Sequence, residues 1–150
     1  MARKARIHVP GVIQHIMSRG IEGKDIFADD EDRTTFLHIL SESLSIAGHR
    51  CYAWVLLPNH YHLLLRSSEE PLGIMMCRLN STYARYFSIK YNRRGYLFQD
   101  RYKSITTQDQ NYVEELVRYI HLRCRTRSVV SILGYQHQQC GEQCEREKGL

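Results

Sequence analysis

The sequence predicts an α+β domain: a ferredoxin-like β-α-β-β-α-β sandwich with an antiparallel sheet, plus a C-terminal helix. Three observations support this fold class. The chain has 150 residues, a length that suits a single domain with one hydrophobic core. Short apolar runs alternate with longer segments of helical periodicity. A turn signal, Pro58-Asn59, joins two of the apolar runs directly, which gives the order strand, helix, strand, strand, helix, strand, helix.

The predicted strands are apolar and aromatic runs that end at turn residues. They are Val12–Ser18, Arg50–Leu57, His60–Arg66 and Leu97–Ile105. The segment Gly20–Asp30, between the first strand and the first helix, is predicted to be a loop.

The predicted helices have start signals and stripes of apolar residues. Asp29 or Asp30 can cap the first helix, which ends at Gly48. Thr107 with Gln110 resembles a capping box for the third helix. The expected buried stripes are Phe36, Ile39, Leu40 and Leu44 in the first helix, Leu72, Met76, Leu79, Tyr83 and Phe87 in the second, and Val113, Leu116, Val117 and Ile120 in the third.

The charge distribution favours a polyanionic partner, because the chain has 21 Lys and Arg and 16 Asp and Glu, which gives a net charge of +5. Between Arg78 and Lys103, Asp100 is the single acid. The basic residues there are Arg78, Arg85, Lys90, Arg93, Arg94, Arg101 and Lys103, with Tyr83, Tyr86, Tyr91, Tyr96 and Tyr102 interleaved. This pattern suits either a single-stranded nucleic-acid surface or a solvated basic face whose tyrosines lie in the core.

The sequence favours a cytoplasmic protein. No run of about eighteen apolar residues could span a membrane. The N-terminal MARKARIHVPGV lacks the apolar region of a secretory signal. The five cysteines are scattered and odd in number, which is typical of reduced thiols.

Two histidines lie two residues apart in the predicted third strand, within PNHYHLLL. Side chains alternate along a strand, so His60 and His62 point to the same face, with Cα atoms roughly 6.5–7 Å apart. Tyr61 and Leu63 then face the core. The histidines can bind one metal ion if a third ligand comes from elsewhere, or they can be polar residues on a solvated face.

The third helix leaves a polar stripe beside its buried one. Tyr112, Glu115, Tyr119 and Arg123 share this stripe, because residues three, four and seven apart are neighbours on a helix. A tyrosine hydroxyl, with a pKa of about 10, is a poor nucleophile at neutral pH. It can attack phosphorus if a divalent ion polarises the phosphate; otherwise Tyr119 is an ordinary half-buried helix tyrosine.

Six segments together resemble the REP-associated tyrosine transposases, which belong to the single-tyrosine HUH nucleases of the IS-two-hundred-like superfamily. They are SRGIEGKDIF (Ser18–Phe27), DDEDRTTFL (Asp29–Leu37), LLPNHYHLLL (Leu56–Leu65), LNSTYARYF (Leu79–Phe87), GYLFQDRYKS (Gly95–Ser104) and YVEELVRYIHL (Tyr112–Leu122). HUH stands for histidine, hydrophobic residue, histidine, which here are His60, Tyr61 and His62. The resemblance covers about Ala2 to Leu122.

The resemblance implies DNA transposition by metal-dependent nicking and rejoining of single-stranded DNA, often a hairpin. Mg²⁺ or Mn²⁺ would bind His60 and His62, and Tyr119 would attack the scissile phosphate to form a 5′-phosphotyrosine link. Arg101 and Lys103, together with Arg78 and Arg85, would neutralise DNA phosphates. Monomer and homodimer, with the tyrosine acting in its own or the other subunit, both stay open.

The resemblance ends abruptly after Leu122. Relatives usually continue with Asn-Pro, whereas this chain continues with Arg123, which has no lone pair for a metal. Glu115 or water could supply the third ligand, and Arg123 could contact phosphate. We therefore divide the chain into a transposase domain at 1–122 and a divergent tail at 123–150. The alternative function is that of an impaired or non-cleaving relative that binds hairpin or single-stranded DNA.

Overall fold

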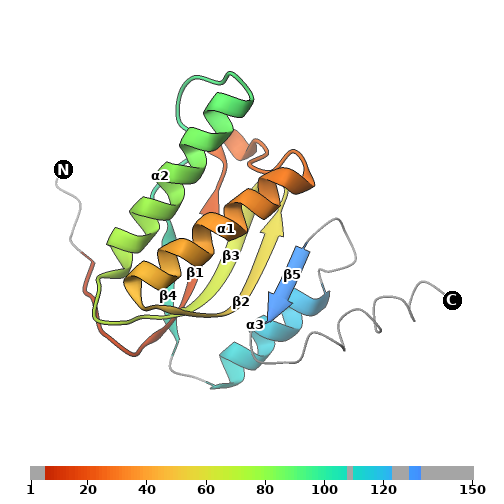
Figure 1. The fold of residues 1–150 in the computed structure, drawn as a ribbon. Helices are drawn as coiled ribbons and strands as arrows, with labels where there is room; N and C mark the ends of the chain where they lie inside the picture. Colours follow the sequence, from red (N-terminus) through yellow and green to blue (C-terminus); the bar gives the residue numbers. More distant parts are fainter. Residues whose placement is uncertain (1–5, 108–109, 123–128, 133–150) are drawn as a thin grey trace, which may run out of the picture.

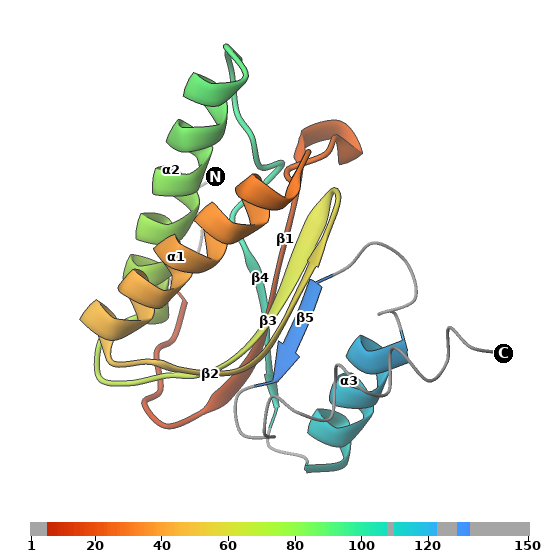
Figure 2. The same ribbon diagram turned by 45° about the vertical axis from the view of Figure 1, so that its right-hand side comes forward.

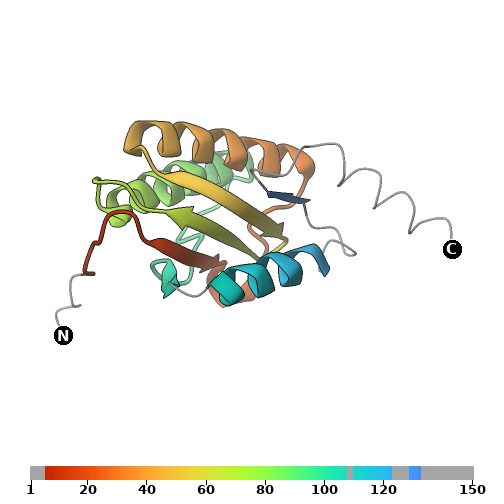
Figure 3. The same ribbon diagram turned by 90° about the horizontal axis from the view of Figure 1, so that it is seen from below.

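The computed structural model describes residues 6–107, 110–122 and 129–132. Along the chain the elements are β1 (Ile13–Arg19), the short 3₁₀ helix η1 (Ile21–Gly23), α1 (Asp30–Ala47), β2 (Arg50–Leu57), β3 (His60–Arg66), α2 (Leu72–Lys90), β4 (Lys103–Thr107), α3 (Gln110–Leu122) and β5 (Val129–Ile132). The sheet forms the middle layer (Figures 1 and 2). Helices α1 and α2 cover one of its faces, and α3 lies against the other (Figure 3).

The sheet confirms the predicted fold class. Its strand order is β4-β1-β3-β2-β5, and every described pair of neighbouring strands is antiparallel. The first four strands have the connectivity expected of a ferredoxin-like β-α-β-β-α-β sandwich, and β5 adds a fifth strand beside β2. The bounds of β2 and β3 agree with those predicted from the sequence.

The main core lies between the sheet and the helices α1 and α2. Tyr61, Leu63 and Leu65 of β3 are fully buried there, against Phe36 of α1 and Tyr83 of α2. A smaller apolar cluster on the other face holds α3 to the sheet. It consists of Ala53, Val55, Leu57, Leu64 and Leu116, with Ile13, Tyr52 and Tyr112 packed against it.

The start and the end of α1 follow the sequence signals. Asp29 is the N-cap: its side chain accepts a hydrogen bond from the Asp32 amide at 2.8 Å, and the Asp32 carboxylate accepts one from the Asp29 amide in return. Gly48 ends the helix with φ of +73°, a left-handed conformation that glycine adopts without strain. Helix α2 begins directly after Pro71.

The predicted fourth strand was placed too early. Strand β4 covers Lys103–Thr107 rather than Leu97–Ile105. Leu97 is buried, and Phe98 makes only an isolated bridge to Gly20. The apolar residues of this run therefore mark a loop packed into the core. Thr107 is the last residue of β4, and α3 begins at Gln110, so Thr107 is not the residue directly before the helix.

Two elements were not predicted. The turn η1 lies inside the segment that was expected to be a loop throughout. Strand β5 lies inside the divergent tail, where Val130 pairs with Val55 of β2. A four-residue strand gives little sequence signal, and its partner strand is more than seventy residues away along the chain. The division of the chain at residue 122 stays a prediction.

Candidate active site

The two histidines of β3 lie on the face of the sheet that α3 covers. Their ring centroids are 5.0 Å apart, with the rings nearly perpendicular. Tyr61 and Leu63 are fully buried on the opposite face, as the alternation of side chains predicts. His62 is buried and His60 is half-buried, so the pair combines an ordered ring with one nearer to solvent.

The ring of His60 is oriented by the residue before it. The His60 Nδ1–H donates to the Asn59 side-chain oxygen at 2.6 Å, and the Asn59 Nδ2 group donates to the Gly23 carbonyl at 3.3 Å. Asn59 therefore links the histidine to the η1 turn. A hydrogen bond at Nδ1 assigns the lone pair of a neutral imidazole to Nε2, the nitrogen that would bind a metal ion.

A third histidine, His15, was not predicted as part of the site. It lies on β1, is 5% exposed, and its Nε2 is 3.0 Å from the Nδ1 of His62. Its own Nδ1 lies 3.2 Å from the hydroxyl of Tyr112 on α3. Burial lowers the pKa of His15, which favours the neutral ring. Its position in a predicted strand was a signal, but the pairing of β1 with β3 was needed to place it beside His62.

Tyr119 and the histidine pair line one pocket of about 530 Å³. Tyr119 comes from α3 and is 44% exposed. The described lining residues are Met17, Ser18, Arg19, Asn59, His60, His62, Gln99, Asp100, Arg101, Lys103 and Tyr119. The fold thus brings a phenol and two imidazoles from different elements to the same cavity, beside three basic side chains.

The other predicted residues are divided between two faces of the sheet. Arg101 and Lys103 line the pocket. Arg78 and Arg85 lie on α2, in the layer across the sheet, where Arg78 is 3.5 Å from a carboxylate oxygen of Glu70. Arg123 falls outside the described residues.

The structure does not bring Glu115 to the histidine pair. Glu115 is exposed on α3 and is not among the described residues that line the pocket. Within residues 6–107, 110–122 and 129–132, no group of three His, Cys, Asp or Glu side chains is arranged to hold a metal ion. Asp100 is the carboxylate among the described lining residues, and no sequence pattern marks it as a ligand.

Most tyrosines of the basic segment belong to the packed interior or to its edge. Tyr83 and Tyr102 are buried, and the Tyr91 hydroxyl donates to Asp32 at 2.8 Å. Tyr96, at 82% exposed, projects into solvent. Of the two interpretations of this segment, the core interpretation holds for most of these rings, and base stacking stays open for Tyr96.

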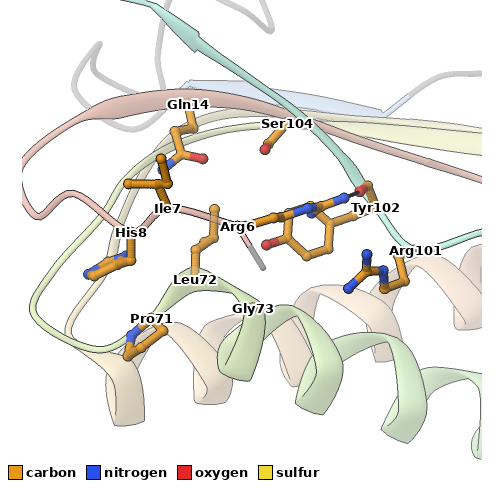
Figure 4. A pocket seen from close by; sticks show the side chains of 10 residues that line it. All are labelled: Arg6, Ile7, His8, Gln14, Pro71, Leu72, Gly73, Arg101, Tyr102 and Ser104. Atoms are coloured by element: carbon orange, nitrogen blue, oxygen red, sulfur yellow. Dashed lines mark hydrogen bonds between the residues drawn. The ribbon is translucent and has the colours of Figure 1, made fainter. Parts of the chain in front are cut away.

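A second cavity of about 230 Å³ lies on the side of the sheet that α1 and α2 cover (Figure 4). Gln14 and Ser104 line it from the sheet, and Leu72 from the start of α2. The guanidinium carbon of Arg6 lies 3.8 Å from the centroid of the Tyr102 ring, which fixes the N-terminal segment against it. Arg101 lines both cavities, so the same cation is shared by the cavities on the two faces of the sheet near β4.

Residues 8–123 match the family model described as "Transposase IS200 like". The match covers more than half of the chain. The chain belongs to the IS200-like transposase family. In the comparison with curated proteins, no sequence matches.

Among the solved structures that resemble this IS200-like transposase are the following three. One is a REP-associated tyrosine transposase bound to a REP hairpin (13% identity, 82% of this chain and 72% of that chain covered, TM-score 0.64). Another is a protein assigned as a transposase, from Deinococcus radiodurans (18% identity, 81% and 98% covered, TM-score 0.56). The third is tRNA(His) guanylyltransferase from Saccharomyces cerevisiae (9% identity, 81% and 62% covered, TM-score 0.52).

At these identities the structural likeness shows the fold alone. The presence of a tRNA-modifying enzyme among the three makes the same point, because one fold serves different chemistries. The residues of the pocket must therefore carry the functional argument. None of the helices described in the transposase is both long and apolar enough to cross a membrane.

Proposed function

We propose that this IS200-like transposase nicks and rejoins single-stranded DNA through a 5′-phosphotyrosine intermediate on Tyr119. The observation that carries the proposal is that Tyr119, His60 and His62 line the same pocket. A nucleophile on one helix and two nitrogen ligands on one strand are otherwise far apart along the chain. A cavity shared by all three gives a phosphate a place to meet them together.

The two imidazoles of the pocket offer nitrogen donors to a divalent cation, which the family resemblance implies to be Mg²⁺ or Mn²⁺. His60 and His62 would hold it through nitrogen. Asp100 is the one carboxylate among the described lining residues, but it does not form a three-residue metal cluster with the two histidines. Water and phosphate oxygens would complete the coordination. When bound, the ion would polarise the scissile phosphate and stabilise the negative charge that develops there.

The chain's own groups account for the displacement. The Tyr119 oxygen attacks phosphorus, a phosphotyrosine bond forms, and the bond from phosphorus to the 3′ oxygen breaks. The phenol loses its proton, and the leaving oxygen gains one to become a 3′-OH. When another 3′-OH attacks the phosphotyrosine, the same bonds exchange in reverse and Tyr119 is released, so no external energy source is consumed.

Three cations surround this chemistry. Arg19, Arg101 and Lys103 line the pocket with a single described carboxylate, that of Asp100. Their positive charge would attract the DNA backbone and stabilise the charge of the reacting phosphate. The hairpin in the REP-associated transposase structure supports a structured single strand as the partner of this chain as well.

A second candidate is a transposase relative that binds such DNA without cutting it. The observation in its favour is that the described residues offer no complete three-residue metal cluster. The basic lining of the pocket would still bind phosphates in that case.

One experiment separates the candidates. The protein is incubated with labelled single-stranded hairpin DNA and MgCl₂ or MnCl₂, and denaturing gels show whether DNA stays attached to protein. Wild type and Tyr96→Phe, a matched tyrosine change at an exposed site, should form the covalent adduct, whereas Tyr119→Phe should not. Binding without any adduct in wild type would support the non-cleaving candidate. Cleavage by a fully active Tyr119→Phe variant would support an unrelated phosphoryl-transfer mechanism.

A further inference from the structure

We propose that His15 and Tyr112 are positioning residues: they fix the ring of His62 and connect it to α3, the helix that carries Tyr119. This inference deepens the proposed function and rests on it. Neither residue lines the described pocket, so neither is expected to contact DNA or an ion there. Their role would be to orient a residue that does.

The contacts form a continuous line from helix to strand. The Tyr112 hydroxyl is 3.2 Å from Nδ1 of His15, and Nε2 of His15 is 3.0 Å from Nδ1 of His62. The two imidazoles are also stacked, with centroids 5.2 Å apart and planes 25° apart. His15 is 5% exposed, so surrounding atoms hold its ring in this orientation.

The sheet register creates this contact. Met17 of β1 is the residue opposite His62, and Leu64 of β3 is opposite His15. His15 and His62 are thus diagonal neighbours on the face that α3 covers, a separation that rings can bridge. The contact does not depend on a loop, which makes it suitable for holding a ligand in one orientation.

Two proton arrangements are consistent with the line of contacts. In one, His62 Nδ1–H donates to His15 Nε2, and His15 Nδ1–H donates to the Tyr112 oxygen. In the other, the Tyr112 hydroxyl donates to His15, which donates to His62. Only the first arrangement gives His62 a lone pair on Nε2, as a metal ligand requires. The proposal is that the buried contact with His15 selects this tautomer.

Tyr112 connects this line of contacts to α3, the helix that carries Tyr119. Tyr112 and Tyr119 are seven residues apart on α3, a spacing of about two turns that places both on one face of a helix. When α3 is docked so that Tyr112 reaches His15, the same docking directs Tyr119 toward the pocket. This line of contacts would therefore position Tyr119 and the ring of His62 relative to each other.

The experiment measures which nitrogen of the His62 ring carries the proton in the metal-free protein. Histidine labelled with ¹⁵N reports through two-bond ¹H–¹⁵N correlation spectra which nitrogen carries the proton. In wild type His62 should carry it on Nδ1. His15→Phe, which keeps a ring but removes the acceptor, should lower this population. His15→Gln, whose side-chain oxygen can accept from His62, should restore it. The matched control is His38→Gln at an exposed position of α1.

A second readout is the Mn²⁺ dissociation constant, measured by electron paramagnetic resonance. It should rise about 10- to 100-fold in His15→Phe, the usual cost of losing an outer-shell partner, and stay within about threefold of wild type in His15→Gln. Tyr112→Phe should raise it by a smaller factor, because His15 itself remains. Thermal unfolding verifies that each variant is folded; if His15→Phe is not, wild type and His15→Gln still provide the tautomer test.

Several results would overturn the positioning role. These are a wild-type His62 protonated on Nε2, a tautomer unchanged in His15→Phe, or a folded His15→Phe variant with wild-type Mn²⁺ affinity and tautomer. Failure of the proposed function would look different. Wild type would then bind no Mn²⁺ and form no adduct, while the tautomer comparison in the metal-free protein would still decide the role of His15.

Discussion

Leu116 holds α3, the helix that carries the proposed nucleophile Tyr119, to the sheet, and its truncation gives a quantitative prediction. Among the α3 side chains that the structure describes, Leu116 is the buried apolar one, at 8% exposed, and it packs with Val55 and Leu64. Replacing a buried leucine by alanine costs about 2–5 kcal/mol. Because α3 lies at the surface and can relax toward the gap, we expect a cost of about 2–3 kcal/mol.

This cost converts into a measurable change in α3. At about 1.4 kcal/mol per factor of ten, the ratio of docked to undocked helix should fall about 30- to 150-fold in Leu116→Ala. Hydrogen exchange measures this directly, since protection of the α3 amides should fall by the same factor while β1 and β3 keep theirs. Tyr119 is three residues after Leu116, so adduct formation with hairpin DNA should slow in parallel.

The matched control is Leu40→Ala, which removes a leucine that is 3% exposed from the main core on the other face of the sheet. It should lower the melting temperature and leave adduct formation near wild type at temperatures well below melting. The reasoning would be refuted if Leu116→Ala lost α3 protection and still formed adduct at the wild-type rate. Equal losses of activity in both variants would refute it as well.

Three further predictions test the pocket and the stability of the fold. His60→Ala should abolish adduct formation with only a modest loss of DNA affinity in a gel-shift assay, because it removes a proposed ion ligand and not a cation. Arg101→Ala should weaken DNA binding and reduce the slope of log affinity against log salt by about one, since one phosphate contact is lost. An unchanged slope would show that Arg101 does not contact a DNA phosphate. The same measurement on Arg85→Ala tests whether the opposite face of the sheet contacts DNA. Burial lowers the pKa of His49, whose Nδ1 accepts from the Ser68 amide at 2.8 Å. The unfolded chain therefore binds the proton more tightly, and stability should decline as pH falls below about 6.5. In His49→Asn, which keeps an acceptor that does not titrate, melting temperatures at pH 5.5 and 7.5 should lie closer together than in wild type; an equal difference would contradict the assignment.

Local signals predicted the elements that local chemistry determines. The hairpin of β2 and β3 was predicted with the observed bounds, because a tight Pro58-Asn59 turn fixes where both strands meet. The common face of His60 and His62 followed from strand alternation alone. Helix α1 begins after Asp29, one of the two residues expected to cap it, and ends at the left-handed Gly48, as expected.

Pairings between distant segments could not be predicted in this way. His15 lies beside His62 only because β1 and β3 adopt one particular register. Leu97 looked like part of a strand because a buried loop and a buried strand leave the same apolar run in sequence. Asp100 reaches the pocket from that loop, and no local pattern marks where a loop residue will lie.

Strand β5 has a consequence for how the protein can be shortened. It pairs with β2 through Ala53 to Leu56, although it follows the last residue that matches the transposase family. A chain that stopped at Leu122 would leave the Ala53–Leu56 stretch of β2 without the strand that pairs with it, and the backbone amides and carbonyls on that side would be exposed. Such an edge recruits strands from other molecules, so truncation should promote aggregation even if every residue of the pocket is present.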